Sequence, residues 1–254
     1  MKAPSLMRAA ICLPALLALA GCATGVSVKS ILANPDDQLA SAFTPANLSA
    51  NARDTVKNAD STPLGFHKMV INLHWDLIDN DKTKTVQLEQ QRTFVNAGGS
   101  FVQSIIRDSR NGVPTSTQFD LTYRGLVTLR SQQFLASSVR IPLAMATHKF
   151  TSFTPIGNGN NLDYAYTYGY AGQWAGFRDE RKTCTQGKPY PASKIFATLQ
   201  GQARDIECTT YNNNNVTTGT RGYAYLEHYG IALYLHAKLA DGDSDAKVTS
   251  VTVQ

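Results

Sequence analysis

The chain has 254 residues, of which 43% are hydrophobic, so it can bury the core of one large or two small domains. Its formal net charge at pH 7 is only +5. This mild excess excludes the dense basic surface that is typical of nucleic-acid-binding proteins, and we expect no nucleic-acid partner.

The first residues, MKAPSLMRAAICLPALLALAG, have the proportions of a signal peptide. Lys2 and Arg8 precede an apolar run over residues 9–20. That run is shorter than the roughly 20 residues that a membrane-spanning helix needs. We therefore predict that residues 1–21 are removed, which lowers the net charge from +5 to +3.

The signal segment ends in LAGC, at Leu19–Cys22. This motif resembles the lipobox of bacterial lipoprotein precursors. The resemblance implies cleavage before Cys22, a diacylglyceryl thioether on its sulfur and acylation of its new amino group. Ala23, in place of aspartate, is similar to the pattern sorted to the outer membrane of Gram-negative bacteria. We expect a lipid-anchored protein of that membrane, facing the periplasm; the alternative is an ordinary secretory signal with an incidental cysteine.

Residues 22–62 differ from the rest of the chain, because they are rich in Ala, Asn, Ser, Thr and Asp. We interpret them as the lipidated N-terminus and a tether. Asn34 before Pro35 and Thr44 before Pro45 each place a capping residue ahead of a helix-starting proline. Short helices are therefore expected at these two positions.

Residues 63–254 repeatedly alternate apolar and polar residues, which is typical of half-buried strands. KMVINLHWDLI and FDLTYRGLVTLR are two examples, and Asn111-Gly112 is a strong hairpin signal. We predict an antiparallel all-β domain, built as a sandwich, a barrel-like sheet or a single curved sheet. The segments show no consistent lipid-facing apolar side, which disfavours a membrane-spanning barrel.

Tyrosines alternate along one face of the segment NNLDYAYTYGYAGQW, from Asn160 to Trp174. A second tyrosine-bearing segment, residues 222–239, is predicted as one long strand whose apolar face Glu227 interrupts. A shared aromatic layer would bind flat apolar ligands or sugars, whereas the alternative is cross-strand packing. The candidate ligand-binding residues of the first segment are Tyr164, Tyr166, Tyr168, Tyr170 and Trp174.

Two cysteines remain after Cys22, namely Cys184 and Cys208. In an oxidising periplasm an even pair predicts a disulfide. The alternative, a metal site with two cysteines, lacks companion ligands at metal spacing.

Motifs for catalysis and metal binding are missing from the sequence. There is no G-x-S-x-G and no H-E-x-x-H, and DGDSD at residues 241–245 lacks the later glycine and acid of a calcium loop. A Ser–His–acid triad assembled from distant positions stays open. We predict a protein that is not an enzyme and has no metal and no cofactor.

As a whole the chain resembles the uncharacterised outer-membrane lipoproteins of proteobacteria, with a lipobox, a tether and a disulfide-bearing β domain. The resemblance implies a non-enzymatic interaction or assembly module that contacts the membrane through its lipid and has an envelope protein as partner. The alternative is a carrier or sensor that encloses an apolar ligand or lipid. A filled interior would favour the module, and an interior cavity lined by the tyrosines would favour the carrier.

Overall fold

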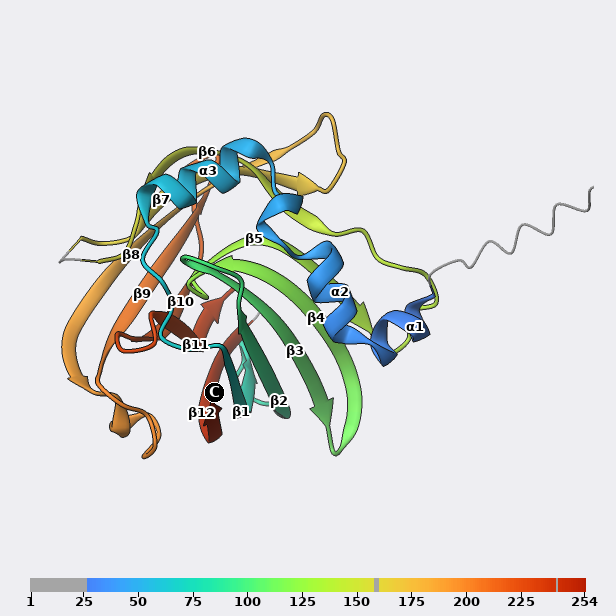
Figure 1. The fold of residues 1–254 in the computed structure, drawn as a ribbon. Helices are drawn as coiled ribbons and strands as arrows, with labels where there is room; N and C mark the ends of the chain where they lie inside the picture. Colours follow the sequence, from blue (N-terminus) through green and yellow to red (C-terminus); the bar gives the residue numbers. More distant parts are fainter. Residues whose placement is uncertain (1–26, 158–159, 241) are drawn as a thin grey trace, which may run out of the picture.

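The computed structural model describes residues 27–157, 160–240 and 242–254, so Cys22 and the predicted signal peptide lie outside the described residues. Twelve antiparallel strands in these residues form a closed barrel (Figure 1). The predicted antiparallel all-β fold is confirmed, and a barrel is the form it takes. The strands are β1 (Lys68–Asp79), β2 (Thr85–Asn96), β3 (Phe101–Arg110), β4 (Val113–Tyr123), β5 (Val127–Leu135), β6 (Met145–Thr154), β7 (Asp163–Tyr170), β8 (Arg178–Pro191), β9 (Gln202–Asn212), β10 (Thr217–Leu226), β11 (Ile231–Leu239) and β12 (Gly242–Val253).

Each strand pairs with its neighbours in the sequence, and β1 also pairs with β12 to close the barrel. The predicted hairpin at Asn111-Gly112 is confirmed between β3 and β4. Both residues have positive φ angles, 51° and 76°. A two-residue turn of this kind matches the twist of the strands it joins, and Asn-Gly adopts it with little strain.

Three helices and a short 3₁₀ helix precede the barrel: α1 (Val28–Ala33), α2 (Pro35–Ala42), η1 (Pro45–Asn47) and α3 (Ala50–Ala59). Helix α2 and η1 begin at the two prolines predicted from the sequence. The segment packs against the barrel, because Phe43, Ala52 and Val56 are fully buried and the Phe43 ring lies 5.8 Å from that of Phe119. No helix of the described residues is long and apolar enough to cross a membrane.

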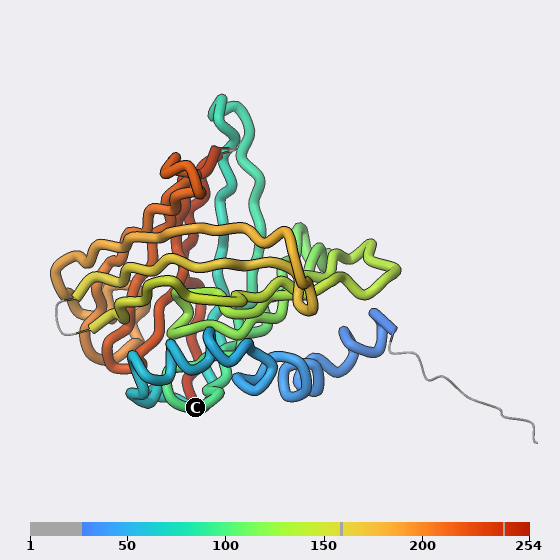
Figure 2. Tube along the Cα trace, turned by 90° about the horizontal axis from the view of Figure 1, so that it is seen from above, coloured from blue at the N-terminus to red at the C-terminus, as the bar shows by residue number. Residues whose placement is uncertain are grey.

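The barrel wall has a weak seam between β5 and β6, which pair over only two residue pairs. Helix α3 lies along β6 at this seam (Figure 2). The hydroxyl of Ser49 donates to the His148 carbonyl over 2.6 Å, and the Phe150 N–H donates to the Asn51 side chain over 2.7 Å. The helix therefore satisfies backbone groups of β6 that β5 leaves without a ladder partner.

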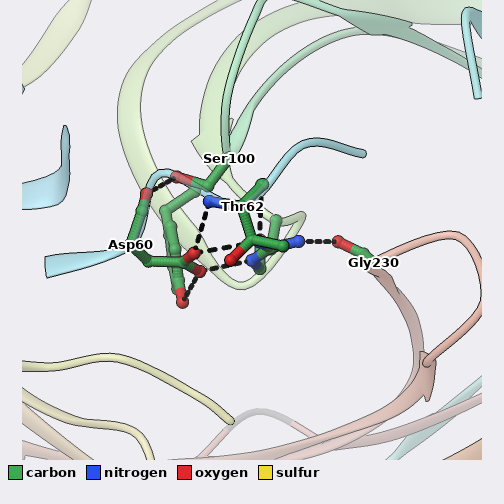
Figure 3. A network of polar contacts seen from close by, with 6 residues as sticks. Asp60, Thr62, Ser100 and Gly230 are labelled. Atoms are coloured by element: carbon green, nitrogen blue, oxygen red, sulfur yellow. Dashed lines mark hydrogen bonds and ion pairs between the residues drawn. The ribbon is translucent and has the colours of Figure 1, made fainter. Parts of the chain in front are cut away.

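After α3, the chain is fixed to the end of the barrel by the buried carboxylate of Asp60 (Figure 3). Arg124 in the β4–β5 turn donates to both carboxylate oxygens, and Tyr123 and the Thr62 N–H donate as well. Arg124 also donates to the Gly230 carbonyl in the β10–β11 turn, over 3.0 Å. One ionic network thus joins the helical segment to two turns of the barrel.

Strands β3 and β4 are largely buried on both faces, because the helices cover the face that points away from the barrel interior. Their apolar positions, including Phe101, Ile105 and Phe119, belong to the same core cluster as the helices. The side chain of Gln103 on this outer face donates to the carbonyls of Leu39 and Phe43, over 3.0 and 3.1 Å. Since successive side chains of a strand point to opposite faces, the intervening polar residues point into the barrel.

The second tyrosine-bearing segment is not one long strand, so that prediction was wrong. Strand β10 ends at Leu226, and β11 begins at Ile231 after a tight turn. Gly230 enables this turn with a φ of 67°. Glu227 lies in the turn and forms an ion pair with Arg204, so it does not interrupt an aromatic face.

The disulfide between Cys184 and Cys208 is present, as predicted. The two cysteines occupy directly paired positions of β8 and β9. Both are buried, and they pack within the same cluster as Tyr164 and Ile206. The bond therefore links two neighbouring strands within the wall of the barrel.

Candidate functional site

The interior of the barrel contains a half-open cavity of about 530 Å³. Residues from ten strands, β2 to β11, line it. Its polar and aromatic lining includes Gln90, Arg92, Asp108, Gln118, Asp120, Tyr166, Tyr168, Glu180, Lys182, Arg221, Tyr223 and Tyr234. A cavity of this size suits a small molecule, since ligand pockets typically measure about 300–1,000 Å³.

The acidic side chains of the cavity are occupied by neighbouring donors. Glu180 accepts hydrogen bonds from the hydroxyls of Tyr166 and Tyr168, over 2.6 and 2.9 Å. Asp108 accepts from Gln90 over 2.7 Å and from Ser116 over 2.6 Å. These contacts fix the positions of the two carboxylates, whose charges still favour the protonated forms of Arg92 and Lys182.

Asp120 lies deeper in the wall, and only 5% of it is exposed. Both of its oxygens accept from the Gln118 amide over 2.9 Å. Burial raises the pKa of Asp120 above its ordinary value, and the nearby positive charge of Arg92 opposes this rise. Asp120 is thus a polar wall group whose charged form is disfavoured by its burial.

Four cationic residues line the cavity: Arg92, Arg130, Lys182 and Arg221. None of them forms an ion pair within the described residues, although the charges of Asp120 and Asp108 act on Arg92 and that of Glu180 acts on Lys182. The Arg92 guanidinium lies 5.4 Å from the ring centroid of Tyr234 and 5.8 Å from that of Trp75. Aromatic faces partly stabilise a desolvated cation, but they do not neutralise its charge.

Lys182 is held over two aromatic rings, with its Nζ 5.7 Å from the ring centroid of Tyr166 and 5.9 Å from that of Tyr164. Burial lowers the pKa of Lys182 to about 8, and the neighbouring positive charge of Arg221 contributes to the fall. A bound anion would offset both effects, because it favours the protonated amine.

The five aromatic candidate residues of segment 160–174 lie in three different environments. Tyr164 is 1% exposed and packs in the core against Phe150, with ring centroids 6.2 Å apart. Tyr166 and Tyr168 line the interior cavity. The structure thus brings two of the five candidate residues to the same cavity and leaves Tyr164 beneath it.

The other two candidates, Tyr170 and Trp174, lie on the surface. Strand β7 ends at Tyr170, so the predicted alternation does not reach Trp174, which lies in the β7–β8 turn. Gly172 and Gly176 have positive φ angles of 82° and 72° and reverse the chain there. Trp174 is 91% exposed, and both residues line a second groove together with Leu143.

Sequence reasoning missed the cations of the cavity: Arg92, Arg130, Lys182 and Arg221. Arg92 shares a strand face with Phe94, and Arg221 shares one with Tyr223, so alternation alone did not mark these cations as cavity residues. The available signal lay in residues 28–59, whose apolar side chains are numerous enough to cover one outer face of the sheet. Covering that outer face turns the polar positions of β3 and β4 inward.

Comparisons with known proteins give distant structural similarities alone. No family profile and no curated protein sequence matches it. A crystal structure of a β-barrel-like protein of the domain of unknown function DUF1849, from Brucella abortus, matches with a TM-score of 0.46 at 8% identity, over 74% of this chain and 98% of that chain. A DUF1329 family protein from Desulfovibrio piger matches with a TM-score of 0.40 at 12% identity, over 79% and 90% of the two chains.

The described part of the chain contains no group of three or more His, Cys, Asp or Glu side chains placed to hold a metal ion. Asp243 and Asp245, from the DGDSD sequence, lie on β12.

Proposed function

We propose that this protein is a lipid-anchored lipoprotein of the outer membrane whose barrel binds a small anionic ligand, as a carrier or a sensor. The observation that carries the proposal is an excess of positive charge in the cavity lining: Arg92, Arg130, Lys182 and Arg221 face three carboxylates, of which Asp120 has its charged form disfavoured by burial. An uncompensated charge inside a protein is costly, and a ligand of opposite charge removes that cost. The proposal involves binding and no catalytic step.

The aromatic side chains of the cavity lining indicate what the uncharged part of the ligand is. Tyr166, Tyr168, Tyr223 and Tyr234 present aromatic faces and hydroxyl groups to the same space as the cations. Tyrosine rings pack on flat apolar groups or sugar rings and donate hydrogen bonds at their edge. The supported ligand is therefore amphipathic and anionic, whereas the sequence suggested an apolar ligand, a lipid or a sugar without specifying a charge.

Native mass spectrometry of the full mature chain tests the binding proposal. Residues 28–59 must be kept, since their buried side chains form part of the core. We expect the Cys22→Ser protein, purified from the periplasmic fraction, to carry an anionic small molecule. The same protein with Lys182→Met/Arg221→Met added should lose it. Lys188→Met, an exposed lysine on the same strand and outside the cavity lining, is the control.

Two outcomes would overturn the proposed binding function. A Cys22→Ser protein that carries no small molecule and takes up no anion from an envelope extract would refute it. Equal occupancy in that protein and in a folded variant with Lys182→Met/Arg221→Met added would also refute it, because binding would then not depend on the interior cations.

The anchoring part of the proposal rests on the lipobox and is tested separately. We expect mass spectrometry of the membrane-extracted protein to find acyl chains on Cys22 and none on a Cys22→Ser variant. Cys12→Ser, within the predicted signal peptide, is the matched control and should leave acylation intact. Acylation that persists in the Cys22→Ser variant would show that the lipobox assignment is wrong.

A second candidate function is an interaction or assembly module with an envelope protein as partner. One observation favours it, namely the exposed apolar side chains of the β5–β6 and β7–β8 connections, among them Val139 and Trp174. Photocrosslinking from position 174 in cells would join the protein to a defined envelope protein if this candidate is correct.

A further inference from the structure

Exposed apolar side chains are concentrated in two short segments. Seven of the eleven large hydrophobic side chains that are exposed among the described residues fall within residues 135–143 and 170–177. We call six of them the apolar rim: Val139, Ile141, Leu143, Tyr170, Trp174 and Phe177. Soluble proteins rarely leave such a cluster uncovered, so the apolar rim is expected to have an occupant.

The two segments are held next to each other. The Ala171 N–H donates to the Ala144 carbonyl over 2.7 Å. The His148 ring lies 4.5 Å from the ring of Phe177, and one groove of about 550 Å³ is lined by both Leu143 and Trp174. The apolar rim is therefore one surface and not two separate loop tips.

The β5–β6 part of the apolar rim lies beside α1, at the start of the described chain, in both views (Figures 1 and 2). The β7–β8 turn lies farther from α1, at the top of the molecule in Figure 1. Gln132 links α2 to the β5–β6 connection, because it accepts from Gln38 of α2 over 2.9 Å and donates to the Pro142 carbonyl over 2.7 Å. The β5–β6 connection is thus attached to the N-terminal helices.

The length of chain between the proposed anchor and α1 is short. Cys22 precedes Ser27 by five residues. Five residues span at most about 18 Å when fully extended. A lipid anchor on Cys22 therefore keeps α1 and the adjoining β5–β6 part of the apolar rim close to the bilayer.

We propose that the apolar rim rests on a phospholipid bilayer surface, with Trp174 inserted at the level of the headgroups. This inference builds on the lipoprotein proposal for its orientation. Tryptophan is enriched at membrane interfaces, and apolar side chains bind there in proportion to the area that they bury. Arg140 and Arg178, both exposed beside the apolar rim, suit the phosphate groups of lipids.

Docking in this orientation also places the ligand site near the membrane. The groove of the apolar rim and the interior cavity are both lined by Met145 and Tyr168, so the two spaces adjoin. A ligand would then pass between the bilayer surface and the cationic interior without crossing bulk periplasm.

Tryptophan fluorescence tests this inference, because the chain has only two tryptophans. Trp75 is 3% exposed and Trp174 is 91% exposed, so a Trp174→Phe variant reports the buried residue alone. The lipidated mature protein is reconstituted into vesicles of equal parts phosphatidylethanolamine and phosphatidylglycerol. We expect brominated lipid to quench wild-type emission, aqueous iodide to quench it little, and the lipid quenching to be absent in Trp174→Phe.

A second arm separates this inference from the lipoprotein proposal. The Cys22→Ser protein is mixed with the same vesicles and sedimented. We expect measurable binding that falls about tenfold in an Ile141→Ser/Leu143→Ser variant, because two apolar side chains leave the interface. Val216→Ser, an exposed apolar residue of the β9–β10 connection, is the control and should bind as Cys22→Ser alone.

The two proposals fail in different ways. An acylated Cys22 with Trp174 open to iodide and unquenched by brominated lipid would refute membrane docking and leave the lipoprotein assignment standing. An unlipidated Cys22 together with quenching of Trp174 by brominated lipid would refute the lipoprotein assignment and leave membrane docking standing. A crosslink from position 174 to a protein rather than to lipid would also show that docking on the bilayer is wrong.

Discussion

Arg124 Nε donates to Oδ2 of Asp60 over 2.6 Å, in an ion pair whose side chains are 4% and 9% exposed. The pair closes a loop of more than sixty residues between the helical segment and the β4–β5 turn. Arg124 itself adopts a positive φ of 47°, and Gly125 follows it with a φ of 72°. The turn thus places the guanidinium beneath Asp60 at the cost of an unfavourable backbone conformation.

Replacing Asp60 by asparagine should destabilise the fold by about 3–5 kcal/mol, because it leaves the buried charge of Arg124 without its partner. Urea denaturation followed by circular dichroism would measure this loss. Asp54→Asn, in an exposed pair with Arg53, is the control and should change little. Equal midpoints for Asp60→Asn and the wild type would show that the network does not hold the segment.

The same ion pair should shape the acid stability of the protein. Burial of Asp60 opposes its ionisation, but hydrogen bonds from Arg124 and the Thr62 N–H lower its pKa from 3.8 to about 2. Because the folded-state pKa lies below the ordinary value, this stabilisation is complete above about pH 4. It is lost as the pH falls toward 2, and it amounts to about 2 kcal/mol. The difference in unfolding free energy between the wild type and Asp60→Asn should therefore shrink over that range, and a constant difference would contradict the assignment.

Replacing Phe43 by alanine should cost about 3–5 kcal/mol, as for other fully buried phenylalanines. Phe43 is 0% exposed and stacks on Phe119 across the interface between α2 and β4. Thermal unfolding would show a lower midpoint with a single transition if the helices and the barrel unfold together. Two separate transitions in the wild type would instead identify residues 28–59 as an independent unit.

Removal of the disulfide should lower stability by about 3.5 kcal/mol, according to the chain-entropy relation for a bond between residues 24 apart. Denaturation of a Cys184→Ala/Cys208→Ala variant measures the effect. Peptide mapping without reductant should recover the two cysteines as one cross-linked fragment. Recovery of free Cys184 from oxidised protein would refute the bond.

Binding of an anion in the cavity should depend on pH through Lys182. Since burial and Arg221 lower its pKa to about 8, the amine loses its charge as the pH rises through that value. Its other close neighbours are Glu180 and the rings of Tyr164 and Tyr166. The affinity for anilinonaphthalene sulfonate, which stays anionic, should therefore fall between pH 7 and about 9.

Conservative variants make the pH prediction specific to Lys182. Lys182→Arg should keep the affinity and flatten the profile, because the guanidinium stays protonated throughout. Lys188→Met should retain the wild-type profile. Unchanged pH dependence in Lys182→Met would place the titrating group elsewhere.

Local sequence patterns predicted many elements of the fold, but not α1 or α3. Alternation predicts the strands, Asn111-Gly112 predicts a hairpin, and two prolines predict the starts of α2 and η1. Each of these signals acts over a few residues and depends on backbone preferences and side-chain direction. The same local reasoning failed at Glu227–Gly230, where a turn interrupts a segment whose composition favours a strand throughout.

The sequence by itself thus determined an antiparallel all-β fold, the pairing of Cys184 with Cys208 and a proposed anchor at Cys22. Only the tertiary structure decided that the barrel closes through β1 and β12, and that its cations point inward. Alternation assigns residues to two faces of a strand but does not say which face is the interior. That choice was made by the helices, whose apolar side chains, including Phe43, cover the outer face of β3 and β4 and leave the polar face to line the cavity.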